Sequence, residues 1–141
     1  MNRLTALSIL DGRNAAQVEE LSAYFSEYAF MQYRIRVEVA YLLFLSQKVK
    51  LFRKLTQKEL VILNKLWRDF DIEDAQKVKE IEQTTKHDLK AIEYFIRSKL
   101  AKTTLADVIP FIHFGLTSYD VTICAYGLML TDCREQIVTP M

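Results

Sequence analysis

The sequence predicts an all-α protein, and three observations support this. Only three glycines and two prolines occur among 141 residues, so few positions interrupt a helix. Half of the residues are apolar, and they recur at three- and four-residue steps instead of alternating with polar residues as in a strand. The length suits one compact domain with a substantial core and leaves no room for a second complete domain.

Charge and composition narrow the classes of partner. The 19 Lys and Arg nearly balance the 18 Asp and Glu, giving a formal net charge of +1, which argues against a nucleic-acid binder. No window reaches the roughly 18 uninterrupted apolar residues of a membrane span. Residues 1–8 resemble neither a secretory nor an organellar leader. We therefore expect a soluble cytoplasmic protein that binds neither nucleic acid nor membranes.

Cys124 and Cys133 are expected to be free thiols. Nine positions on a helix separate two residues by roughly 13 Å, which is too far for a disulfide. Unpaired thiols suit a reducing compartment. Because the cysteines lack CxxC or CxxH spacing and His87 and His113 lack HxxxH or HExxH spacing, we expect no metal and no cofactor.

The first long predicted helix begins at Ser26 and Glu27, which can cap it. Three- and four-residue steps between apolar residues then predict one inward face. We expect the opposite face to expose Arg34, Arg36, Glu38 and Gln47. The predicted inward residues are Phe30, Tyr33, Val37, Ala40, Tyr41, Phe44 and Leu45.

The next two helices have clear start signals. Residues 56–59 read Thr-Gln-Lys-Glu, the form of a capping box, and predict a helix over 56–69. Acidic residues at 73 and 74 favour the first turn of a following helix, whose inward residues are Ala75, Val78 and Ile81. The polar run 83–86 is expected to end or bend that helix.

Two more helices complete the chain. Apolar spacing after His87 and Asp88 predicts an amphipathic helix to about residue 100, with cations near its C-terminal end. Pro110 interrupts a short apolar stretch, residues 115–118 form a turn, and residues 117–120 can cap a last helix to about Val138. That last helix is apolar nearly all round, so we expect it to need burial on every side and to leave some surface bare in this chain.

Three polar clusters interrupt the helices, at residues 11–14, 84–88 and 117–120. Each lies at a helix start or turn, where free backbone N–H groups can meet an anion. Taken alone, the residues favour a purely structural role for each cluster: a turn with a charged residue at 11–14, and helix caps at 84–88 and 117–120. Of the two histidines, His113 is expected to be packed in its apolar run, whereas His87 is the functional candidate because the neighbouring Asp88 can orient its tautomer.

These clusters carry a resemblance to the bacterial adenylosuccinate lyase family. The string from Thr84 to Asp88 is similar to the start of the family's Thr-x-His-Asp-Val-x-Ala-x-Glu block. The string from Phe111 to Asp120 resembles its Phe-Ile-His-x-x-x-Thr-Ser-x-Asp block. Five segments match in the family's order: 10–13, 25–28, 36–39, 81–95 and 111–120.

The resemblance implies the all-α fold of the fumarase/aspartase superfamily, with an N-terminal helical domain over 1–115 and the start of the central helical bundle over 116–141. It implies elimination of fumarate from adenylosuccinate, giving AMP, and from the succinylated aminoimidazole carboxamide ribotide. It also implies a homotetramer whose sites draw on three subunits.

Site residues follow from the same resemblance. Arg13 is expected to contact the nucleotide, His87 and Asp88 to line the reacting end, and Thr117 with Ser118 to hold the succinyl portion. His87 would position substrate or support proton transfer. Such donors suit a transition state that gathers negative charge on a carboxylate.

The chain departs from the family pattern in several places. Asn14 occupies the position of a common Tyr, which affects the expected nucleotide contact there, and Lys86 stands where Asn is frequent. A second His segment, the family's general acid, and a Gly-Ser-Ser-x-Met-Pro loop, which carries the base, are absent from the 141 residues. We therefore expect an N-terminal fragment that is inactive alone. Two alternatives remain: a fragment of another fumarate-releasing lyase of the argininosuccinate lyase type, or a free-standing helical interaction module.

Overall fold

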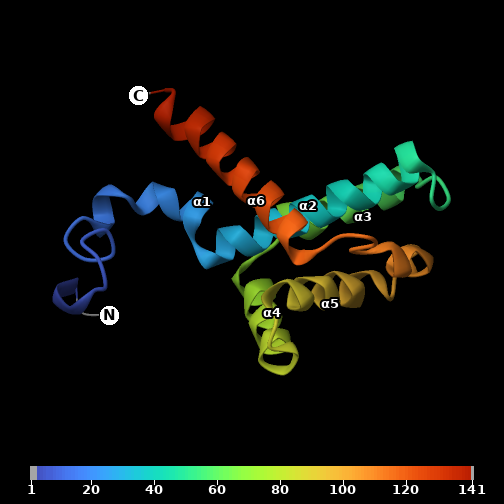
Figure 1. Ribbon diagram of the computed structural model, residues 1–141, viewed down its shortest axis with the longest axis horizontal. Coiled ribbons are helices and arrows are strands. Elements are labelled where there is room, and N and C mark those ends of the chain that lie inside the picture. The colour runs from blue at the N-terminus through green and yellow to red at the C-terminus, as the bar shows by residue number, and fades with distance from the viewer. Residues whose placement is uncertain (1–2, 141) are drawn as a thin grey trace.

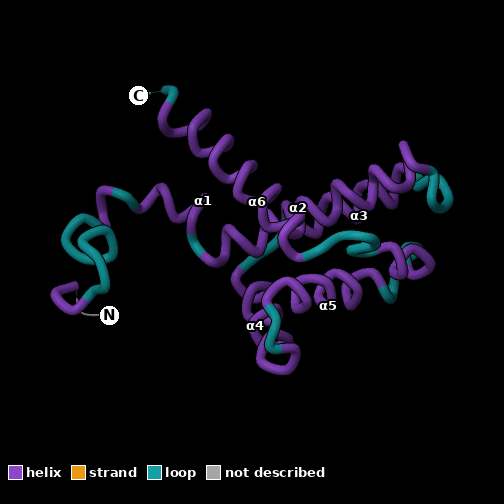
Figure 2. The backbone as a smooth tube through the Cα atoms, in the orientation of Figure 1, coloured by secondary structure: helices purple, strands orange, loops and turns teal. Residues whose placement is uncertain are grey.

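The computed structural model describes residues 3–140, which form helices joined by short loops (Figure 1). No strand occurs in these residues (Figure 2), so the all-α prediction is confirmed. Short 3₁₀ helices lie at Arg3–Thr5, Ala15–Gln17, Glu19–Leu21 and Ala106–Phe111. The α-helices are α1 (Ser22–Phe25), α2 (Glu27–Phe44), α3 (Gln57–Arg68), α4 (Ile72–Thr85), α5 (Asp88–Leu100) and α6 (Ser118–Cys133).

Helix α2 is the centre of the packing, because α3, α4, α5 and α6 all contact it. Ser26 caps it as predicted, its hydroxyl accepting the Ala29 N–H at 3.1 Å. The predicted polar face is wrong in part, because Arg34 and Glu38 are buried. Neighbours cover α2 on more than one side, and both side chains meet polar partners there, Arg34 the Asp88 carboxylate and Glu38 the His113 ring.

The predicted starts of the next three helices are confirmed. Glu59 and Thr56 form the capping box of α3, and the Asp71 carboxylate accepts the Asp74 N–H at the start of α4. Helix α4 ends within the predicted polar run, where Lys86 takes a left-handed conformation with φ of 51°. His87 then caps α5.

The main core lies between α2, α3, α4, α5 and the segment that leads to α6. Apolar burial contributes most of the stability of such a core. Its largest fully buried side chains are Phe95, Ile35, Leu63, Leu89, Ile92, Ile96, Leu100, Leu105, Val78, Val108 and Val121. This arrangement fixes the end of α4, the start of α5 and the start of α6 relative to one another.

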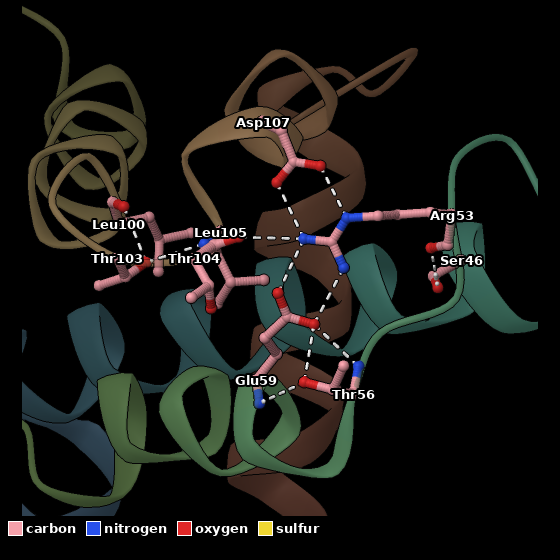
Figure 3. Close-up of polar contacts among 9 residues, drawn as sticks. All are labelled: Ser46, Arg53, Thr56, Glu59, Leu100, Thr103, Thr104, Leu105 and Asp107. Carbon is pink, nitrogen blue, oxygen red and sulfur yellow. Dashed lines mark hydrogen bonds and ion pairs between the residues drawn. The ribbon is translucent and has the colours of Figure 1, made fainter.

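A charged cluster fastens the loop after α2 to the segment before α6 (Figure 3). Arg53 donates to both carboxylate oxygens of Glu59 at 2.7 and 2.9 Å and to both oxygens of Asp107 at 2.7 and 2.9 Å. It also donates to the Thr104 carbonyl at 3.0 Å. The start of α3 and the 3₁₀ helix Ala106–Phe111 are thereby joined through one guanidinium.

Helix α6 begins after a tight turn in which His113 and Gly115 have φ of 60° and 70°. It packs on α2 through Ala125 and Met129, and its last turn still contacts α2, since the Asp132 carboxylate accepts from Tyr33 at 2.9 Å and from Arg36 at 2.6 Å. A π-helical turn, Arg134–Val138, continues it to the predicted end. The expected bare surface is present in part: Leu130 and Val138 are exposed, and so are Ile123 and Tyr126, whereas Met129, which was expected to be bare, is buried against α2.

Two further expectations concern the cysteines and membrane-spanning helices. Cys124 and Cys133 are free thiols, as predicted. Across residues 3–140, no helix is long and apolar enough to cross a membrane.

Candidate functional site

The starts of α5 and α6 lie together and present polar groups to one pocket. His87 is the N-cap of α5, and its Nδ1 accepts the Lys90 N–H at 3.2 Å. Ser118 is the first residue of α6, and its Oγ lies 3.4 Å from His87 Nε2. The pocket has a volume of about 320 Å³ and is lined by Thr85, His87, Leu89, Lys90, Glu93, His113 and Ser118.

The helix cap fixes the tautomer of His87. Because Nδ1 accepts a backbone N–H, the neutral ring carries its proton on Nε2, the nitrogen that faces Ser118. The prediction that Asp88 orients this ring is wrong, since Asp88 Oδ1 lies 3.6 Å from Nδ1, beyond hydrogen-bond distance. A backbone group sets the tautomer instead, and Nε2–H remains a donor for a ligand in the pocket.

Asp88 turns away from His87 toward other partners. Its Oδ2 accepts from Arg34 Nη1 at 2.7 Å, and its Oδ1 accepts the Leu89 N–H at 2.8 Å. Burial alone would raise the pKa of Asp88, but these two bonds outweigh it and lower the pKa. Asp88 is therefore an ionised carboxylate at neutral pH, with one hydrogen bond on each oxygen.

A second imidazole lies at the same pocket. His113 is half-buried, and its Nδ1 lies 2.6 Å from Oε1 of the buried Glu38. Burial raises the pKa of Glu38, and the bond to His113 opposes that rise. The sequence placed His113 in a packed apolar run and did not link it to Glu38. The missed signal is that Glu38 falls on the three- and four-residue stripe of Met31, Ile35 and Leu42.

The Glu93 carboxylate is paired with two cations of its own helix, α5. Glu93 is buried and accepts from Lys90 at 2.7 Å and from Arg97 at 2.9 Å. Burial would raise the pKa of Glu93, but these two cations outweigh it and lower the pKa. Glu93 therefore presents little net repulsion to an anion that enters the pocket.

The remaining predicted site residues lie differently. Thr117 is exposed, and both its N–H and its hydroxyl donate to the Asp120 carboxylate, at 2.7 and 2.9 Å. These bonds lower the pKa of Asp120. Arg13 and Asn14 belong to the N-terminal segment, far from the α4–α5 turn in Figure 1. The structure thus brings His87, Ser118 and, beside them, Thr117 to one place, but not Arg13 or Asn14.

The geometry suits a carboxylate ligand. His87 Nε2–H and the Ser118 hydroxyl are donors that can converge on an anion, and both stand at helix N-termini, whose dipoles favour negative charge. Among residues 3–140 no cluster of three His, Cys, Asp or Glu side chains could hold a metal ion.

Comparison with known proteins agrees with this geometry. The family model described as a lyase matches residues 12–141. The chain is 42% identical to the adenylosuccinate lyase of Dictyostelium discoideum, covering 99% of this chain and 31% of that protein. It is 38% identical to the enzyme of Haemophilus influenzae and 37% identical to that of Escherichia coli, again covering 99% of this chain and 31% of each relative. The chain therefore belongs to this lyase family, the fumarase/aspartase superfamily, and relatives that match nearly all of its residues are adenylosuccinate lyases.

Proposed function

We propose that these residues form one part of the substrate site of an adenylosuccinate lyase. The reaction would release fumarate from adenylosuccinate to give AMP, and from the succinylated aminoimidazole carboxamide ribotide. The convergence of His87 Nε2 and Ser118 Oγ, 3.4 Å apart at two helix starts, is the observation that carries this proposal. The names of the relatives support it at the level of the family.

The donors fit the chemistry of such an elimination. As the C–H bond beside a carboxylate breaks, negative charge accumulates on that carboxylate, and fixed donors stabilise it most in the transition state. We assign His87 Nε2–H and the Ser118 hydroxyl to the succinyl portion of the substrate. In this assignment the Thr117 hydroxyl does not bind the substrate, because it donates to Asp120. Thr117 instead caps α6 and so helps to place the neighbouring Ser118.

In this proposal, residues outside these 141 and residues of other subunits supply the remaining parts of the site. The chain spans 31% of the length of the relatives named above, and its 141 residues hold neither the second His segment nor the flexible Ser loop. We therefore propose that the 141 residues alone do not turn over. Arg13 and Asn14 contact the nucleotide in a homotetramer, where each site combines residues of several subunits. The N-terminal segment that carries these two residues lies apart from the α4–α5 turn in Figure 1, which supports that assignment.

The proposal extends to domains and location. Residues 1–115 form the N-terminal helical domain, and 116–141 begin a central bundle; the exposed apolar side chains of α6 support this division. Two free thiols suit the cytoplasm.

Fumarate release by the product of the complete reading frame tests the proposed function. The absorbance of fumarate measures turnover of each substrate. We expect turnover with adenylosuccinate and none with argininosuccinate. Turnover of argininosuccinate alone would assign the chain to the other branch of the family. The absence of fumarate from either substrate, with the protein folded, would refute the proposal.

A further inference from the structure

The guanidinium of Arg34 joins the starts of α5 and α6. Nη1 donates to Asp88 Oδ2 at 2.7 Å, and Nη2 donates to Thr122 Oγ1 at 3.2 Å. Asp88 follows His87 directly, and Thr122 lies one turn after Ser118 on the same helix. One side chain from α2 thus contacts both helices that supply the pocket with donors.

Arg34 is buried to a degree that is unusual for its type. Its side chain is 8% exposed, and the guanidinium lies 3.7 Å above the ring of Phe30, which in turn stacks on Tyr126 of α6 at 4.7 Å. Its Nε has no hydrogen-bond partner among the described residues. A buried charge with an unsatisfied donor contributes little net stability compared with an apolar residue. Stability alone therefore does not account for an arginine here.

We propose that Arg34 is a positioning residue that sets the separation of His87 and Ser118 by holding Asp88 and Thr122. This inference rests on the proposed function, in which those two donors bind the succinyl portion. It also changes the expected role of Asp88. Each carboxylate oxygen of Asp88 accepts one bond, from Arg34 or from the Leu89 N–H, and an ionised carboxylate repels an anionic substrate, so we assign Asp88 to anchoring α5 and not to substrate contact.

Arg36 provides a matched control on the same helix. Its Nη1 donates to Asp132 at 2.6 Å, and its guanidinium lies 5.2 Å from the ring of Trp67. Asp132 is in the last turn of α6, away from both helix starts. Arg36→Met therefore removes an arginine and an ion pair between α2 and α6 without releasing the pocket.

Amide hydrogen exchange without substrate tests the coupling itself. In Arg34→Met we expect exchange over residues 89–93 and 119–123 to rise by about tenfold relative to wild type, because both helix starts lose their shared anchor. Arg36→Met should leave those segments unchanged. Unchanged exchange in Arg34→Met, or an equal rise in Arg36→Met, would overturn the proposal. If Arg34→Met does not fold, Thr122→Val removes one arm only and should give a smaller rise confined to 119–123, whereas unchanged exchange there would count against the anchor.

Kinetics of the complete enzyme test whether loss of the Arg34 anchor lowers the rate of fumarate release. We expect kcat/KM for fumarate release to fall about 10- to 100-fold in Arg34→Met, as misplaced reacting groups do, and to change less than about threefold in Arg36→Met. Asp88→Asn should give a loss similar to Arg34→Met, and the double variant should be no worse than either single one. Losses that multiply would show that Asp88 acts on the substrate directly. A wild-type enzyme that releases no fumarate would refute the proposed function, while the exchange experiment still decides the role of Arg34.

Discussion

Replacing Glu59 with Gln should destabilise the fold through the charged cluster of Figure 3. The Glu59 side chain is 4% exposed and accepts four hydrogen bonds, two from Arg53 and two from the N–H and hydroxyl of Thr56. A Gln amide oxygen can still accept from Thr56, but its NH₂ group then faces an Arg53 donor. The variant thus loses the charge and at least one bond.

The size of this loss follows from the hydrogen bonds. Hydrogen bonds to a charged group contribute about 1.5–3 kcal/mol each, and Gln keeps part of them, so we expect a loss of about 2–3 kcal/mol. The same hydrogen bonds from Arg53 and Thr56 outweigh burial and lower the pKa of Glu59 from 4.5 to about 2.

The pH dependence follows from the direction of that change. Because the folded-state pKa lies below 4.5, ionised Glu59 stabilises the fold at pH values above about 4.5, and this contribution is lost as the pH falls toward about 2. Urea unfolding followed by circular dichroism should show a large difference between wild type and Glu59→Gln at neutral pH that shrinks on acidification. Asp107→Asn is the control, since Asp107 binds the same arginine but is 54% exposed, and it should cost less. A Glu59→Gln loss that is independent of pH, or equal to that of Asp107→Asn, would refute the reasoning.

Three further predictions concern the core, the pocket and α6. Leu63→Ala should lower the free energy of unfolding by about 2–5 kcal/mol, because a fully buried side chain leaves a cavity; a loss near zero in urea unfolding would contradict this packing. In the complete enzyme, His87→Ala and Ser118→Ala should each lower kcat/KM for fumarate release by about 10²-fold, whereas His113→Gln should act mainly on thermal stability; wild-type kinetics in His87→Ala would remove that residue from the site. The exposed apolar side chains of α6 should make the 141-residue chain bind a hydrophobic dye, and Leu130→Gln should weaken binding; equal dye fluorescence in both would place the dye elsewhere.

Helix starts were predictable because they depend on local chemistry. Ser26 and Thr56 satisfy backbone N–H groups within one turn, and the acidic residues of the first turn of α4 suit the helix dipole, so the sequence alone indicates these starts. The faces of α2 were not predictable in this way. Several helices contact α2, so residues on more than one side of it are buried, and no single apolar stripe marks what lies inside.

In the candidate site, too, the features set by local sequence were predictable and the contacts between distant segments were not. His87 and Ser118 were predictable from motifs at two helix starts, since a cap is encoded within a few residues. The partners of the buried charges were not, because Arg34 meets Asp88 and Glu38 meets His113 across 54 and 75 residues of sequence. A pattern within one helix carries no information about which distant segment will lie opposite.

Helix α2 therefore has two roles: it packs in the core, and it contacts the elements that form the pocket. Its sequence alone does not separate the residues of the two roles. Met31, Ile35, Val39 and Leu42 bury apolar surface and hold the helix in the core. Arg34 and Glu38, one turn apart, extend from the same helix to the start of α5 and to the turn before α6. Apolar packing is tolerant of small changes in position, whereas a charged hydrogen bond has a narrow range of distance and angle. The ion pairs of α2 thus fix the positions of pocket residues more closely than its apolar contacts can, so conservative changes at Arg34 and Glu38 should disturb the pocket more than conservative changes in the core.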